Sequence, residues 1–159
     1  MTRAAEAFDE ALHELGLDQR ELDDEEQFGR RAALLAASEL LWQRELGPML
    51  NTSRVGELLR CSRQAVNERV HRGTILALPA PGEFAFPLFQ FTGGGQPVSG
   101  ISRVMRAFTD AVETPYTVAA WLVAPEPELD GKAPIEVLRR GQTDQAVTAA
   151  ERYAERLRR

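Results

Sequence analysis

A short segment around residue 65 carries side chains that could recognise nucleic-acid bases. Four polar residues in it are spaced at i, i+1, i+4 and i+8, so that a helix would present them on one face. In the major groove of DNA, arginine can bind O6 and N7 of guanine, and glutamine or asparagine can bind N6 and N7 of adenine. Each such pair discriminates against a wrong base by roughly 1 to 3 kcal/mol. The spacing predicts the readout of a DNA sequence by Arg63, Gln64, Asn67 and His71.

Further polar residues surround this set. Arginines close to a duplex can neutralise phosphates, which fixes the register of a protein on DNA without carrying sequence information. These arginines are Arg54, Arg60, Arg69 and Arg72. Ser62 is also among the expected DNA-binding residues, and its hydroxyl is a good N-cap for the second helix. A solvated polar face on a helical hairpin is the alternative interpretation of the same pattern.

A helix-turn-helix unit would hold these side chains in place. A first helix, capped by Thr52 or Ser53, would brace the second, and residues 60–61 would form the break between them. Gly73 would end the second helix, because glycine adopts the left-handed backbone without strain. The apolar residues that would pack the two helices are Val55, Leu58, Leu59, Ala65, Val66 and Val70.

Residues 52–91 resemble the winged helix-turn-helix of excisionase and similar small DNA-binding proteins. The resemblance lies in RCSRQAVNERVHRG followed by TILALPAPGEFAFP. It implies a β-hairpin after the recognition helix, with strands at 74–78 and 83–86 and a turn at 79–82. The hairpin lacks lysine and arginine, which would contact phosphate. We expect its aromatic residues to pack on the helices rather than stack on bases; they are Phe84, Phe86, Phe89 and Phe91.

Charge is unevenly distributed along the 159 residues. The formal net charge is −5, but residues 51–106 hold 7 Lys/Arg against 3 Asp/Glu. Residues 1–50 hold 5 against 12, and residues 107–159 hold 7 against 9. A basic segment between two acidic ones is compatible with a DNA-binding module between protein-binding parts. Chance segmentation is the alternative.

Composition limits the possible classes of protein. No apolar run approaches the roughly 20 residues that span a bilayer, and the start of the chain does not resemble a signal peptide. We therefore expect a cytoplasmic protein without membrane contact. The single cysteine, Cys61, excludes an internal disulfide, and with two histidines it makes a poor supply of zinc ligands. No Ser/His/Asp set or cofactor loop is present, so we expect no enzyme, metal or cofactor.

The chain divides into three predicted parts. Residues 1–50 form an acidic helical segment whose second helix, with a broad apolar surface that includes Trp42, is either a buried core helix or a dimerisation helix. Residues 51–92 are the helix-turn-helix with its hairpin. Gly93–Gly95 predict a flexible connection. Residues 98–159 form a small helical domain, so the predicted fold class is mainly α.

The C-terminal part contains clear signals for the starts and ends of helices. An apolar face runs over 101–112, and Thr114 with Pro115 supplies an N-cap and a first-turn proline for a helix at 116–123. In the loop that follows, Leu129 can plug the domain and Gly131 can adopt a backbone shape that other residues resist. Pro134 starts a further helix, which Gly141 stops. By themselves these features explain a stable loop, not a ligand.

The stretch WLVAPEPELDGKAPIEVLRRGQTDQAV resembles the toxin-binding domain of the Xre/MbcA/ParS type antitoxins. The matching positions are Trp121, Leu122, Pro125, Pro127, Leu129, Gly131, Pro134, Leu138 and Gly141. The resemblance implies a RES-domain toxin that consumes NAD, whose active site this domain covers. The residues expected to bind the toxin are Trp121, Leu129, Gly131, Lys132, Pro134, Arg139, Arg140, Arg152, Arg156, Arg158 and Arg159. A purely structural helical hairpin is the alternative.

These features, together with what the antitoxin resemblance implies, predict a non-enzymatic antitoxin. As the resemblance implies, it would neutralise a RES-domain toxin through its C-terminal domain and repress its own operon by binding operator DNA, which we expect it to do as a homodimer. Two recognition helices one DNA turn apart would read a palindrome. The alternative is a transcription regulator whose C-terminal domain senses another signal or only dimerises.

Overall fold

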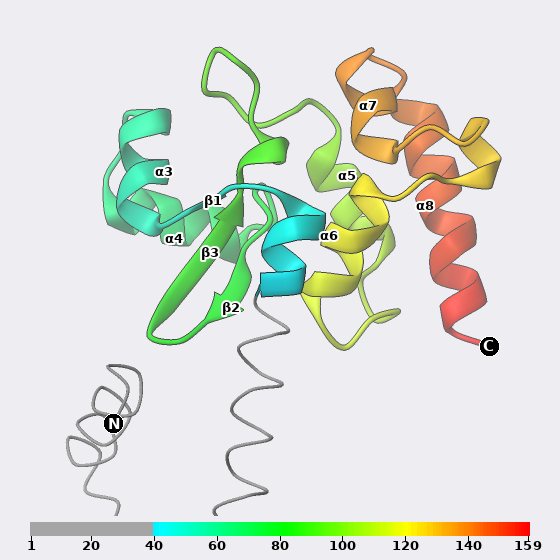
Figure 1. The fold of residues 1–159 in the computed structure, drawn as a ribbon, viewed down its shortest axis with the longest axis horizontal. Helices are drawn as coiled ribbons and strands as arrows, with labels where there is room; N and C mark the ends of the chain where they lie inside the picture. Colours follow the sequence, from blue (N-terminus) through cyan, green and yellow to red (C-terminus); the bar gives the residue numbers. More distant parts are fainter. Residues whose placement is uncertain (1–39) are drawn as a thin grey trace, which may run out of the picture. The chain divides into compact units, whose positions relative to one another are not determined.

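The computed structural model describes residues 40–159. In this part of the chain helices predominate, and three short strands form an antiparallel sheet (Figure 1). The prediction of a mainly α protein with a β-hairpin is confirmed. The chain divides into two units, Met1–Leu41 and Trp42–Arg159. The helices expected before residue 50, with their role in dimerisation, lie outside the described residues, apart from the helical residues 40–46.

The first helix of the helix-turn-helix is α3 (Thr52–Leu59). Its N-cap is Asn51, whose side-chain oxygen accepts a hydrogen bond of 2.9 Å from the amide of Arg54. The prediction that Thr52 or Ser53 caps this helix is wrong, because both already lie inside it. Thr52 is buried at 3% exposure. A shift of one or two residues at a helix end is common when several polar residues adjoin.

The second helix is α4 (Arg63–His71), and its ends are the predicted ones. Ser62 is the N-cap, and its Oγ accepts a hydrogen bond of 3.1 Å from the amide of Ala65. Gly73 follows the helix with φ 64°, in the left-handed region that favours glycine. The turn between the helices contains a left-handed residue as well, Arg60 with φ 55°.

The hairpin consists of β2 (Leu78–Ala80) and β3 (Glu83–Pro87). Their register leaves Pro81 and Gly82 as a two-residue turn, with proline first and glycine second at φ 74°. The second strand agrees with the prediction, but the first was predicted at 74–78 and begins only at Leu78. Residues 74–77 do not pair with β3.

A third strand, β1 (Met49–Leu50), was not expected from the sequence. It pairs antiparallel with β3, so the sheet has the order β1-β3-β2. Two residues are too few to show the alternation of apolar and polar side chains that marks a strand. The strand that precedes α3 is thus joined to the hairpin that follows α4.

Residues 75–78, which we call the bridging segment, run between two clusters of buried side chains. Ile75 and Ala77 belong to the helix-turn-helix cluster, whereas Leu76 and Leu78 belong to the C-terminal cluster. Alternation of this kind is what an extended backbone produces, because successive side chains point to opposite sides. The other buried members of the helix-turn-helix cluster are Val55, Leu59, Val66, Phe86 and Phe91.

The side chain of Gln90 replaces the missing strand partner of the bridging segment. Its Oε1 accepts a hydrogen bond of 2.7 Å from the amide of Leu76, and its Nε2 donates one of 2.8 Å to the carbonyl of Leu76. Nε2 also lies 3.2 Å from the carbonyl oxygen of Pro87. The side chain is completely buried. A buried amide with all these partners satisfies main-chain groups that would otherwise be unpaired.

Gly93–Gly95, for which the sequence predicts a flexible connection, lie in a turn closed by main-chain hydrogen bonds. The amide of Thr92 donates to the carbonyl of Gln96 at 2.7 Å, and the amide of Gly95 donates to the carbonyl of Thr92 at 2.9 Å. A Cβ on Gly95, which has φ 79°, would lie 2.9 Å from the carbonyl oxygen of Leu58 in α3. The segment is therefore a turn packed on α3. The predicted boundary between 51–92 and 98–159 falls inside the unit Trp42–Arg159.

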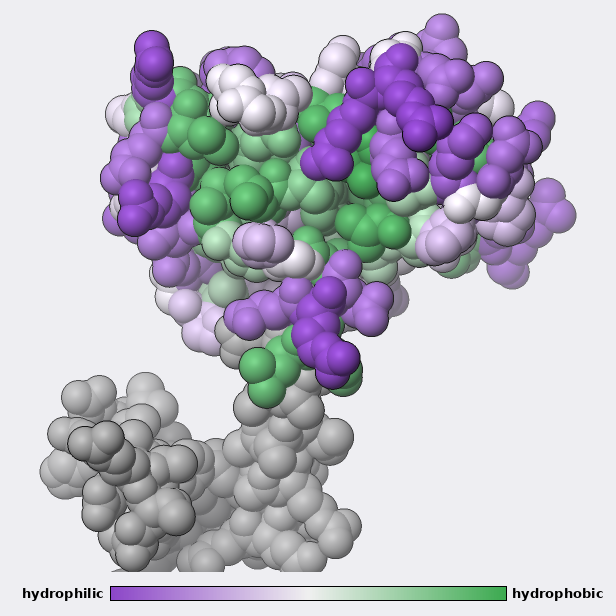
Figure 2. All heavy atoms as spheres, turned by 45° about the horizontal axis from the view of Figure 1, so that its top comes forward, coloured by the Kyte–Doolittle hydropathy of each residue, from purple (hydrophilic) through white to green (hydrophobic). Residues whose placement is uncertain are grey.

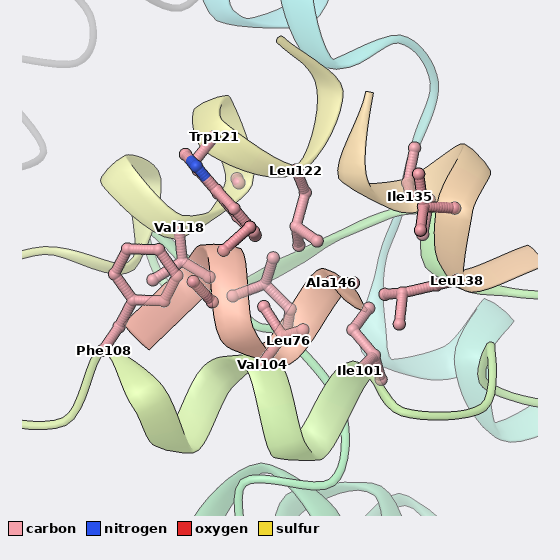
Figure 3. Close-up of a cluster of buried hydrophobic side chains, with 14 of the residues drawn as sticks. Leu76, Ile101, Val104, Phe108, Val118, Trp121, Leu122, Ile135, Leu138 and Ala146 are labelled. Atoms are coloured by element: carbon pink, nitrogen blue, oxygen red, sulfur yellow. The ribbon is translucent and has the colours of Figure 1, made fainter. Parts of the chain in front are cut away.

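The C-terminal helices enclose the second cluster, and Figure 3 shows their side chains converging with Leu76 among them. Pro115 and Pro134 open helices as predicted. The first helix of this part ends at Ala107, earlier than the apolar pattern indicated, since Asp110 turns the chain with φ 62°. Phe108 is nevertheless buried. The elements are α5 (Ile101–Ala107), α6 (Pro115–Val123), η3 (Pro127–Leu129), α7 (Pro134–Arg139) and α8 (Thr143–Leu157).

The predicted packing of the phenylalanines is confirmed. Phe86 and Phe91 are buried in the helix-turn-helix cluster, and Phe84 packs against it. Phe89 packs against the C-terminal cluster. No helix within residues 40–159 is both long and apolar enough to cross a bilayer.

We expect the substitution Gln90→Ala to lower the free energy of unfolding by about 2 to 6 kcal/mol. Each buried donor or acceptor left without a partner costs about 1 to 3 kcal/mol, and both main-chain groups of Leu76 would lose theirs. Urea unfolding followed by circular dichroism measures the change. Gln96→Ala is the matched control, because this exposed glutamine forms its hydrogen bonds through its main chain. Equal stability of the two variants would contradict the role of Gln90.

Candidate nucleic-acid interface

One side of α4 is anchored in the core, and the opposite side is open to solvent. Val66 is completely buried in the helix-turn-helix cluster, which also includes residues of α3 and of the hairpin. The four side chains predicted to read bases are all exposed; they are Arg63, Gln64, Asn67 and His71. Figure 2 shows hydrophilic residues gathered at its left side, over the helix-turn-helix. The structure therefore brings these four residues together on the solvent side of one capped helix.

His71 is held by the helix to which it belongs. Its Nδ1 lies 2.8 Å from the carbonyl oxygen of Asn67. A carbonyl can only accept, so Nδ1 carries the proton in this contact, and Nε2 is left for another partner. In the neutral ring that second nitrogen is an acceptor, suited to a base amino group.

The arginines predicted to contact phosphate differ in their surroundings. Arg60 is exposed in the turn, whereas Arg69 is half-buried. Arg54 and Arg72 are exposed but have acidic neighbours. Arg54 Nη1 lies 3.0 Å from Glu57, and Arg72 Nη2 lies 3.8 Å from Glu68. Exposed pairs of this kind are weak, so both arginines remain available for a phosphate.

Sequence reasoning missed the acidic residues of this surface. Residues 51–73 contain five arginines but also Glu57 and Glu68. Glu68 lies on the exposed side of α4, where its Oε1 is 3.5 Å from Nε2 of Gln64. The i, i+4 spacing of Gln64, Glu68 and Arg72 was the signal that could have revealed it. The surface keeps a positive balance, since five cations face two carboxylates.

The hairpin has no positively charged side chain that could bind a phosphate. Residues 74–92 contain no lysine or arginine, and Glu83, at the start of β3, is exposed. Its aromatic side chains serve the two clusters. The hairpin therefore supports α4 and presents no cation of its own.

The loop between α6 and α7 is closed by a buried carboxylate. Glu126 is 4% exposed, and it accepts a hydrogen bond of 2.8 Å from Nε1 of Trp121. Its carbonyl accepts from the amide of Gly131 at 3.0 Å, and its amide donates to the carbonyl of Lys132 at 3.1 Å. Leu129 is buried, as the plug of the predicted loop should be. The loop is therefore held by a hydrogen bond from α6 and by main-chain hydrogen bonds across its own ends.

Burial separates the residues expected to bind a toxin into two groups. Trp121, Leu129 and Pro134 are buried and support the loop or the start of α7. Gly131, with φ 74°, is exposed, and Lys132 is half-buried with its Nζ 3.8 Å from Asp130. The remaining residues are exposed; they are Arg139, Arg140, Arg152, Arg156, Arg158 and Arg159.

Several of these arginines bind within the chain. Arg156 and Arg152 donate hydrogen bonds of 2.6 and 3.1 Å to Glu128. Arg139 donates to the carbonyl of Phe89 at 2.6 Å, and Arg158 donates to the carbonyl of Thr109 at 2.9 Å. They fasten α7 and α8 to neighbouring segments, so a partner that used them would compete with these contacts.

Comparison with known proteins places the fold but not the function. No family model matches the chain, and no curated protein matches it. Among solved structures, one titled "NMR structure of Rv2175c" matches with a TM-score of 0.59 and 24% identity, over 67% of this chain and 81% of that chain. At this identity the similarity shows the fold alone. Within residues 40–159, no group of three or more His, Cys, Asp or Glu side chains could hold a metal ion.

The ion pairs of Glu128 predict a dependence of stability on pH. The hydrogen bond from Arg156, assisted by Arg152, lowers the pKa of Glu128 below its ordinary value. The unfolded chain therefore takes up the proton at a higher pH than the folded chain does. Stability from these pairs is present above the ordinary carboxyl pKa and is lost as the pH falls through the lowered one.

Glu128→Gln should therefore lose less stability on acidification than the wild type does. Midpoints of urea unfolding, measured from neutral to acidic pH, test this. Glu136→Gln, at an exposed position in the first turn of α7, is the control and should follow the wild type. Parallel curves for wild type and Glu128→Gln would contradict the assignment.

Proposed function

We propose that this protein binds DNA and reads base edges in the major groove with α4. One observation carries the proposal: a capped helix, anchored through Val66, presents Arg63, Gln64 and Asn67 together to solvent. These side-chain types form the paired hydrogen bonds that distinguish guanine and adenine. A transcription regulator is the class of protein that such a surface serves.

We assign the two helices different contacts with DNA. In this proposal α3 braces α4, and its exposed Arg54, together with Arg60 in the turn, meets phosphates beside the groove. Phosphate contacts supply affinity that falls with salt, whereas base contacts supply specificity. Because the hairpin lacks cations, we assign it a supporting role only.

A homodimer remains part of this proposal. α4 has nine residues, and a helix of this length contacts only a few base pairs. Two copies that read two half-sites would multiply the affinity and the specificity.

Replacing Arg63, Gln64 and Asn67 together by alanine should abolish sequence-specific binding. Three base contacts at roughly 1 to 3 kcal/mol each predict a loss of more than about 100-fold. Fluorescence anisotropy measures it, with a DNA site selected by the wild-type protein from a random library. Because the phosphate-binding arginines remain, weak binding to unrelated DNA should persist.

The matched control for this experiment replaces one arginine and two glutamines elsewhere. Arg140, Gln142 and Gln145 are exposed around the start of α8, and their replacement by alanine should leave DNA binding unchanged. Equal loss in both triple variants, or no loss in either, would count against readout by α4.

Neutralisation of a RES-domain toxin is a second candidate function. The resemblance of the C-terminal stretch motivates it, and a mostly apolar groove of about 730 Å³ beside the proline-rich loop could receive side chains of a partner. Trp42, Pro125, Pro127 and Tyr153 contribute to its lining. Co-purification with a RES-domain protein encoded next to this one is the experiment that tests it.

A further inference from the structure

Glu68 occupies the middle of the surface that α4 presents to solvent. Successive residues of a helix are about 100° apart. Gln64 and Glu68 each lie two residues from the buried Val66, and thus about 160° around the helix from it. Arg63, three residues away, lies only about 60° from Val66. A carboxylate is therefore more central on the exposed face than the neighbouring arginine.

The contacts of Glu68 within the chain give it only a small role in stability. Its side chain is 52% exposed, and its ion pair with Arg72 has a separation of 3.8 Å. The contact of its Oε1 with Nε2 of Gln64 is 3.5 Å, at the long limit of a hydrogen bond. Exposed pairs at such distances add little to folding. A negative charge here also repels DNA phosphates. Neither folding nor phosphate binding therefore accounts for a carboxylate at position 68.

A carboxylate at this position is suited to recognising a DNA base. An ionised carboxylate only accepts hydrogen bonds, and in the major groove a carboxylate pairs with the N4 amino group of cytosine. Guanine presents the acceptors O6 and N7 to the groove, and thymine presents O4, so both repel it. Adenine has an amino group at N6 but places the acceptor N7 beside it, which disfavours a second carboxylate oxygen there. We propose that Glu68 is a specificity-determining residue that selects cytosine at one position of the DNA site. This inference rests on the proposed DNA-binding function.

The neighbouring Gln64 fits the same arrangement. When one N–H of its amide is directed to Glu68, its Oε1 and a second N–H remain free. These are the groups that bind N6 and N7 of adenine. Glu68 thus both reads a base and orients the residue that reads a nearby one.

The test is selection of DNA from a random library by the full chain and by its variants. The wild type should enrich a motif that contains a cytosine. Glu68→Gln keeps the length of the side chain but adds a donor, so it should lose the preference at that position by about 5- to 150-fold. It should also weaken the preference at the base read by Gln64 and keep the rest of the motif. Glu68→Asp retracts the carboxylate by one methylene group and should weaken the same preference.

Glu57→Gln is the matched control. Glu57 is likewise exposed and paired with an arginine, at 3.0 Å, but it lies on α3. Its motif should equal that of the wild type, and circular dichroism should show all variants folded, since both glutamates are exposed. A motif unchanged by both Glu68 substitutions would overturn the role of Glu68 alone. No motif for the wild type would overturn the DNA-binding function as well.

Discussion

The pairing of the Gln90 side chain with the main chain of Leu76 is the contact on which the arrangement of residues 42–159 depends. Leu76 is buried, and without a partner its amide and carbonyl would make the bridging segment unfavourable at this place. Gln90 supplies both partners, at 2.7 and 2.8 Å, as a strand would. The segment can then remain extended and send alternate side chains into the helix-turn-helix cluster and the C-terminal cluster.

This arrangement ties the candidate DNA-reading helix to the C-terminal helices. α4 ends at His71, and only a few residues separate it from the bridging segment. That segment contributes buried side chains to both clusters. The turn at 92–97 adds a second connection, because Gly95 packs on Leu58 of α3. The orientation of the base-reading face is therefore set by packing on both sides. Two independently hinged modules would have left that face without such a constraint.

The sequence was sufficient where local signals decide the structure. Local residues mark α4: Ser62 caps its start, Val66 marks its buried side and Gly73 follows its end. In the same way Pro115 and Pro134 mark the starts of two later helices. Features that depend on distant contacts could not be predicted in this way. Nothing local distinguishes Gln90, which is buried as a strand substitute, from an exposed glutamine.

The candidate sites show the same limit. The four base-reading side chains could be named from type and spacing, but Glu68 was missed because a search for cations and amides passes over a carboxylate. Trp121 and Leu129 were both expected to meet a partner, and only Leu129 was also expected to plug the domain. Their burial shows that both support the loop. Glycines 93–95 suggested a linker, because the sequence does not show that Gly95 packs so closely on α3 that a side chain would not fit there.

Native-state hydrogen exchange tests the central claim most directly. If the bridging segment unites both clusters, the amides of Val66 in α4 and Ala150 in α8 should exchange through the same global unfolding. They should then show the same free energy of opening and the same dependence on denaturant. Exchange of Val66 at a clearly lower free energy than Ala150 would show that the helix-turn-helix opens alone, and would contradict the account.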